Sequence, residues 1–71
     1  MTDDEKIAII EDILELPSGT LNTESALEDF EEWDSLAVLS LTVYFDSELG
    51  KILDSKAIRS FKTVQDIIDL M

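Results

Sequence analysis

The chain has 71 residues, the length of one small domain, and contains neither cysteine nor histidine. This lack excludes disulfides, thiolate or imidazole metal sites, and the usual Ser-His and Cys-His nucleophile pairs. Seventeen acidic residues against five basic ones give a net charge of −12, which disfavours nucleic acid and anionic membranes as partners and favours basic protein surfaces.

Residues 2–16 are predicted to form a helix. Thr2 and Glu5 have the spacing of a capping box, and apolar residues then recur at helical spacing. Glu11 falls on the opposite, polar face, which we expect to be exposed. Pro17 is predicted to end the helix, because proline cannot continue it.

Residues 17–33 form a connection longer than the ~12–15 residues typical of loops in compact domains. Thr23 or Ser25 could cap a short turn over residues 26–29, and Ser25 and Glu28 have capping-box spacing. We expect Trp33 to cover the core as a hydrophobic lid, and the two helices that flank the loop to run nearly parallel.

Residues 35–49 are predicted to form a second long helix, ended by Gly50 in a left-handed cap. The helix has two apolar stripes, one of Val38, Leu41, Phe45 and Leu49 and the other of Leu36, Leu39 and Val43. A domain of this size needs one stripe for its core. The second stripe is therefore either buried in the bundle or exposed for a partner.

The rest of the chain predicts a short helix and a final helix. Asp54 or Ser55 can cap the short helix over residues 56–60, and Thr63 with Asp66 can cap the last one over residues 64–70. The apolar residues of the last helix are Val64, Ile67, Ile68 and Leu70, which we expect to face the core. The expected fold over residues 1–71 is therefore one all-α domain. It is a small four-helix bundle with three longer helices, a short third helix, and a long loop between helices 1 and 2.

Asp34 and Ser35 stand at the start of the second long helix, and two interpretations of them are open. Either residue can serve as an ordinary N-cap. Alternatively, Ser35 can carry an attached anion, because the first turn of a helix leaves backbone N–H groups without partners and its dipole is positive there.

This order of elements resembles the acyl carrier protein family. The resemblance rests on Asp34-Ser35-Leu36, on the acidic composition, and on the tail Thr63-Val64-Gln65-Asp66-Ile67-Ile68. It implies that a phosphopantetheinyl transferase esterifies Ser35 with 4′-phosphopantetheine from coenzyme A, within a motif that includes Asp34 and Leu36. The thiol of that arm carries acyl or aminoacyl groups as thioesters, so the chain itself needs no catalytic residue.

The resemblance also implies a docking face for partner enzymes, formed by Leu36, Leu39, Val43 and Asp46. Acidic residues would guide the chain to basic patches on loading and elongating enzymes of fatty-acid, polyketide or related secondary-metabolite biosynthesis. Ser40 and Ser47 stand where family members commonly have acids, which favours a specialised pathway. The expected protein is a monomeric phosphoprotein that binds neither nucleic acid nor membrane.

One alternative is an acidic helical module that regulates a partner and is never modified. A second is a divalent-cation binder, although the chain has no EF-hand loop and only weak binding at its acidic face is expected. The acidic N-terminus differs from a signal peptide, and the longest charge-free run, residues 35–45, is shorter than the ~20 residues of a membrane span. We therefore expect a cytoplasmic location.

Overall fold

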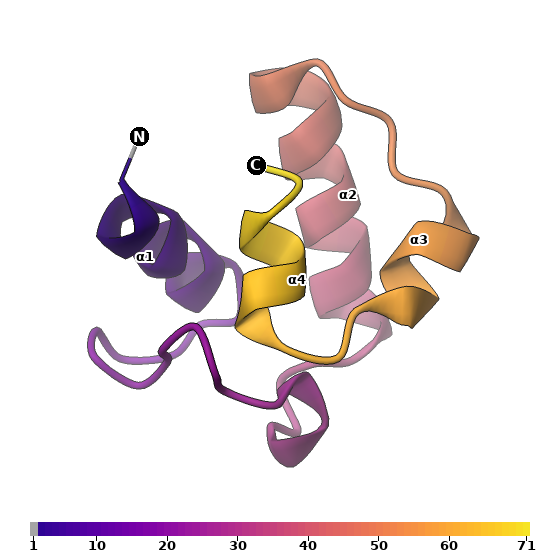
Figure 1. Ribbon diagram of the computed structural model, residues 1–71. Coiled ribbons are helices and arrows are strands. Elements are labelled where there is room, and N and C mark those ends of the chain that lie inside the picture. The colour runs from indigo at the N-terminus through magenta and orange to yellow at the C-terminus, as the bar shows by residue number, and fades with distance from the viewer. Residues whose placement is uncertain (1) are drawn as a thin grey trace.

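The computed structural model describes residues 2–71, and this part of the chain is all-α (Figure 1). Its helices are α1 (Asp3–Ile13), α2 (Ser35–Leu49), α3 (Ser55–Ser60) and α4 (Val64–Ile68), with a 3-10 turn, η1 (Leu27–Asp29), in the long loop. The expectation of three longer helices was wrong, because α4 has 5 residues and α3 has 6. After Ile68 the backbone N–H groups of Leu70 and Met71 donate to the carbonyls three residues earlier and not four. The last turn is therefore tighter than an α-helix, and the helix ends.

Helix α1 begins as predicted and ends early. Thr2 and Glu5 form the capping box at its start. At its end Glu15 adopts a left-handed conformation with φ 58°, and the Leu16 N–H donates to the Glu11 carbonyl at 2.8 Å. This is a Schellman-type end with glutamate in the position that glycine favours. The helix therefore ends at Ile13, before Pro17 is reached.

The expectation that the Glu11 side chain faces solvent was wrong. Only 4% of Glu11 is exposed, and its carboxylate accepts a hydrogen bond of 2.9 Å from the Leu21 N–H. Helical spacing assigned Glu11 to the polar face, but the long loop folds back over that face and covers it.

The long loop is held to the segment that joins α3 to α4. The Leu27 N–H donates to the Lys62 carbonyl at 2.9 Å, and the Val64 N–H donates to the Ser25 carbonyl at 3.1 Å, beside an antiparallel bridge between Ala26 and Thr63. The predicted turn is present as η1, but Ser25 does not cap it: its hydroxyl accepts from the Asn22 N–H instead. These bonds fix the path of the loop towards the start of α2.

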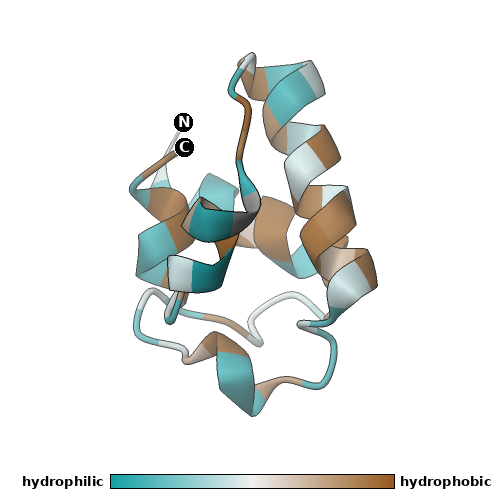
Figure 2. Cartoon of the chain, turned by 90° about the vertical axis from the view of Figure 1, so that its right-hand side faces the viewer, coloured by the Kyte–Doolittle hydropathy of each residue, from teal (hydrophilic) through white to brown (hydrophobic). Residues whose placement is uncertain are grey.

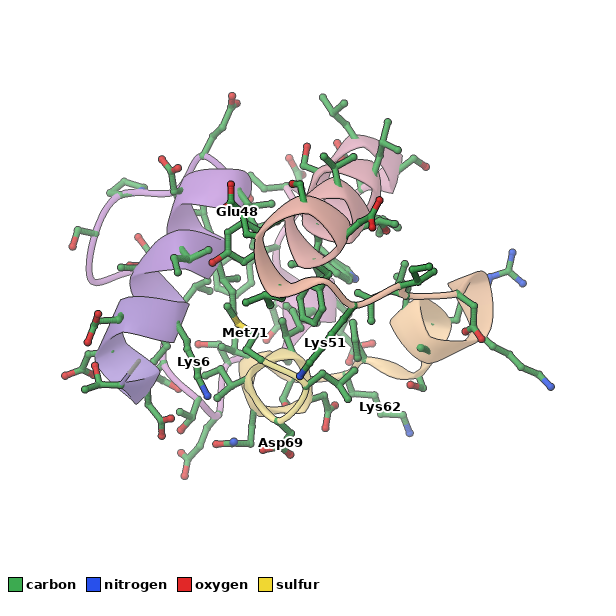
Figure 3. The ribbon with its side chains drawn as sticks, turned by 90° about the horizontal axis from the view of Figure 1, so that it is seen from above. Lys6, Glu48, Lys51, Lys62, Asp69 and Met71 are labelled. Atoms are coloured by element: carbon green, nitrogen blue, oxygen red, sulfur yellow. The ribbon has the colours of Figure 1, made fainter. Side chains whose placement is uncertain are left out.

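Helices α1 and α2 are steeply inclined to each other, with α1 seen from the side and α2 nearly end-on in Figure 3, so the expectation that they run nearly parallel was wrong. Figure 1 shows α1 descending from the N-terminus and α2 rising from the loop below it. The loop stays at one end of the molecule because its buried leucines, Leu21 and Leu27, pin it there. It therefore joins the two helices at neighbouring ends.

The core lies between α1, α2 and α4, and α1 packs against both of the other two helices. Its buried residues come from all four helices and from the loop: Ile10, Leu14, Leu21, Leu27, Ala37, Leu41, Phe45, Ile58, Phe61, Val64, Ile67 and Ile68. Leu70 was expected on the inner face of the last helix, but 38% of it is exposed because it lies beyond the end of α4. Within residues 2–71, no helix is both long and apolar enough to cross a membrane.

The segment between α2 and α3 begins and ends with helix caps that the sequence predicts. Gly50 ends α2 with φ 64°, and the Asp54 carboxylate caps α3 by accepting from the Ala57 N–H at 2.7 Å. Between them, the Lys51 ammonium donates to the Leu70 carbonyl at 2.6 Å, and Figure 3 shows it reaching over the end of α4. A basic residue thus joins the C-terminal ends of α2 and α4, where the helix dipoles are negative.

Candidate functional site

Ser35 is the first residue of α2, and its side chain is exposed. The residue before it supplies the cap: Asp34 Oδ1 accepts from the Leu36 N–H at 3.1 Å and from the Ala37 N–H at 3.0 Å. None of the hydrogen bonds among the described residues involves the Ser35 hydroxyl. Of the two interpretations, the capping function therefore belongs to Asp34, and Ser35 is left as an exposed residue whose hydroxyl is not used by the cap.

This arrangement changes the expected electrostatics of Ser35. The sequence predicted free N–H groups that an anion on Ser35 could use. In the structure two of them, at Leu36 and Ala37, already donate to Asp34. An anion attached to Ser35 thus meets the positive end of the helix dipole, but finds those two donors occupied by a carboxylate.

The second apolar stripe of α2 is exposed, which resolves the alternative that the sequence left open. The exposed fractions are 70% for Leu36, 59% for Leu39 and 55% for Val43. We call these three residues the α2 outer face. On the other side of the helix Leu41 and Phe45 are buried at 1% and 0%. Figure 2 shows apolar colour over most of α2, in keeping with a helix that is hydrophobic on two sides.

Asp46 is exposed on α2, and the α2 outer face begins directly after Ser35. The resemblance described above predicted that Asp46 and the α2 outer face together form a docking surface. The structure places all four side chains at the surface of one helix, and whether a partner binds them stays a prediction.

A hollow of about 470 Å³ lies on the α3 side of Ser35. It is lined by Trp33, Asp34, Ser35, Val38, Ile58 and Arg59. Trp33 is half-buried against the core, as expected of a lid, and also forms a wall of the hollow. The sequence analysis missed Ile58 and Arg59 as neighbours of Ser35, because only the tertiary packing of α3 brings residues so distant in sequence to one place.

The carboxylates with lowered pKa values are structural. Hydrogen bonds from the backbone and side chain of Thr2 lower the pKa of Glu5, and hydrogen bonds from the Lys62 and Thr63 backbones lower the pKa of Asp66. Both belong to helix caps. No group of three or more potential metal-ligating side chains occurs within residues 2–71.

The chain is similar in sequence to a known protein. Over 63 residues the chain is 29% identical to the acyl carrier protein of Petrotoga mobilis (strain DSM 10674 / SJ95), covering 89% of this chain and 74% of that protein. No family model and no solved structure matches the chain. The similarity suggests the acyl carrier protein family.

Proposed function

We propose that this chain is an acyl or aminoacyl carrier protein that bears 4′-phosphopantetheine on Ser35. The observation that carries the proposal is the exposed Ser35 hydroxyl at the start of α2, with Asp34 as a separate cap. The similarity to the acyl carrier protein of Petrotoga mobilis supports it. The fold would then be a small four-helix bundle that acts as a monomer in one domain.

The residues around Ser35 fit such a group. The hydroxyl is accessible, and the adjoining hollow leaves space beside it. In the loading reaction the Ser35 oxygen would bond to the phosphorus of coenzyme A that bears the pantetheine. The bond from that phosphorus to the leaving adenosine 3′,5′-bisphosphate would break, and a base of the transferase would take the hydroxyl proton. Once attached, the arm supplies a thiol that holds acyl groups as thioesters.

The α2 outer face would be the surface that partner enzymes bind. Three large apolar side chains, Leu36, Leu39 and Val43, are exposed in one row beside Ser35, and such surfaces usually contact another protein. Asp46 and Asp34 would add charge that attracts basic patches on the transferase and on loading or elongating enzymes. Fatty-acid, polyketide or related biosynthesis would supply these enzymes.

Intact-mass analysis tests the proposal. The purified chain is incubated with coenzyme A, Mg²⁺ and a broad-specificity phosphopantetheinyl transferase. We expect the wild type to gain the mass of one phosphopantetheine group and Ser35→Ala to gain none. Ser47→Ala is the matched control, because Ser47 is also an exposed serine of α2, and it should load like the wild type. For a chain whose starting mass is that of the unmodified polypeptide, an unchanged wild-type mass, or loading of Ser35→Ala, would refute the proposal.

The second candidate is an acidic interaction module that is never modified. It is favoured by the same exposed residues of the α2 outer face, which need no arm to bind a partner. In that case the mass of the wild type stays unchanged in the loading assay, and it also stays unchanged in protein purified from its native cells.

A further inference from the structure

We propose that the hollow beside Ser35 binds an oxyanion, with the Arg59 guanidinium as its cation. The inference rests on the loading of Ser35 proposed above. The oxyanion has two possible sources, which share their chemistry: the phosphodiester of the arm, or a carboxylate at the end of the carried group.

An anion on Ser35 cannot use two of the backbone N–H donors at the start of α2. Asp34 Oδ1 already accepts from the Leu36 and Ala37 N–H groups, at 3.1 and 3.0 Å. An anion on Ser35 also stands in the field of a chain with net charge −12, which repels it. A cation from another element would offset this repulsion and hold the anion against the protein surface.

Most of the basic residues of the chain lie in one stretch of the sequence. Positions 51–62 contain four of the five, namely Lys51, Lys56, Arg59 and Lys62, with Asp54 as the one acid among them. Of these, Arg59 lines the hollow that also contains Ser35. Trp33 and Arg59 also line an adjoining hollow together with Glu28, Phe61 and Lys62. Two basic residues, Arg59 and Lys62, thus line the hollows on the α3 side of Ser35.

The Arg59 guanidinium can bind an oxyanion and makes no hydrogen bond to another described residue. It is exposed in the last turn of α3, and none of the hydrogen bonds among the described residues involves its guanidinium. The planar guanidinium presents paired N–H donors that match the oxygens of a phosphate or carboxylate. Two acids line these hollows: Asp34, which is engaged with backbone N–H groups, and Glu28, which lines only the adjoining one.

The walls of the hollow favour the contact. Trp33, Val38 and Ile58 supply apolar surface on its sides. Apolar walls exclude part of the surrounding water and so strengthen the attraction between an anion and the guanidinium. They also give the hollow a spectroscopic reporter, because Trp33 is the single tryptophan of the chain.

Quenching of Trp33 fluorescence by acrylamide tests the inference. The chain is loaded from coenzyme A, from butyryl-coenzyme A or from succinyl-coenzyme A, which attach a free thiol, a neutral acyl group or an acyl group with a carboxylate. We expect loading to lower the quenching constant of Trp33, because the bound group shields the ring. Arg59→Ala should reverse most of this decrease, since an exposed charged contact changes occupancy by about two- to fivefold.

The three loaded forms distinguish the sources of the oxyanion. An Arg59-dependent decrease in all of them assigns the phosphodiester, which they share. A decrease confined to the succinyl form assigns the carboxylate of the carried group. Lys56→Ala is the matched control, because Lys56 is an exposed basic residue of α3 that does not line the hollow, and it should behave like the wild type.

Two results would overturn the inference while leaving the proposed function intact. In the first, the chain loads but the quenching constant is the same in wild type and Arg59→Ala for every form. In the second, Lys56→Ala has as large an effect as Arg59→Ala, which would indicate a general field and no binding in the hollow. Failure of the mass to change on loading would instead refute the proposed function, and this inference with it.

Discussion

The Glu11 carboxylate accepts a hydrogen bond of 2.9 Å from the Leu21 N–H, and both residues are buried. This bond joins the last turn of α1 to the beginning of the long loop. A buried carboxylate is costly unless it is hydrogen-bonded, and a buried N–H without an acceptor is costly as well. Each group therefore provides the hydrogen-bond partner that the other needs. The bond also fixes the loop that leads to Ser35 at Leu21, the first buried residue of that loop.

Replacement of Glu11 should weaken the fold. In Glu11→Leu the Leu21 N–H loses its acceptor, and we expect the free energy of unfolding to fall by about 1–3 kcal/mol. Glu11→Gln retains a carbonyl oxygen and should lose less. Urea denaturation followed by circular dichroism measures both. Asp12→Ala, an exposed neighbour, is the control and should stay within about 0.5 kcal/mol of the wild type. A Glu11→Leu variant as stable as the wild type would contradict this account.

The features that could be predicted from the sequence are local ones. The Thr2–Glu5 capping box, the left-handed Gly50 and the extent of α2 depend on residues a few positions apart, and the structure has them as predicted. The resemblance to a carrier protein singled out Ser35 through the short motif around it, and the modification of Ser35 stays a prediction.

The features that could not be predicted depend on contacts between distant segments. Helical spacing placed Glu11 on the solvent side, because it cannot show that the loop returns to cover that face. In the same way, the positions of Ile58 and Arg59 beside Ser35 follow from the docking of α3. The exposure of the α2 outer face was one of two open alternatives, and only the packing of the other helices decides it.

Glycine at position 15 should stabilise the protein. Glu15 has φ 58°, a left-handed conformation that costs a residue with a side chain about 1–2 kcal/mol and costs glycine little. We expect Glu15→Gly to raise the free energy of unfolding by about 1 kcal/mol. Glu15→Ala removes the charge but keeps the backbone strain, and should not give this increase. Equal effects of the two substitutions in urea denaturation would assign the gain to charge and not to backbone conformation.

Truncation of the α2 outer face should slow the loading of Ser35. Leu39 is 59% exposed, so Leu39→Ala should leave the fold unchanged while it removes part of the surface proposed to bind the transferase. We expect kcat/KM for loading to fall about fivefold or more, as for an interface residue of moderate importance. Ile52→Ala is the control, because Ile52 is 87% exposed and lies outside α2. An equal loss in both variants would contradict a docking role specific to the α2 outer face.

The Asp66 cap should make stability depend on acid pH. Its Oδ2 accepts from the Lys62 N–H at 2.8 Å and from the Thr63 N–H at 3.0 Å, which lowers its pKa in the folded state. A carboxyl with a lowered folded pKa stabilises the fold above its unfolded pKa of about 4, and this contribution is lost as the pH falls through the folded pKa. Asp66→Asn should therefore be less stable than the wild type at neutral pH, and the difference should narrow below about pH 4. Thermal unfolding at several pH values measures it, and a constant difference would refute the role of the charge.

Salt should stabilise the chain through screening. The net charge of −12 on so small a domain produces self-repulsion, which weakens as the Debye length falls from about 30 Å at 0.01 M salt to about 3 Å at 1 M. We expect the melting temperature to rise with NaCl, by about 4–8 °C for each 1 kcal/mol of repulsion removed. If screening accounts for the whole effect, MgCl2 at matched ionic strength should give about the same increase. A much larger rise with MgCl2 at low concentration would contradict pure screening and would indicate a specific cation site on the acidic surface.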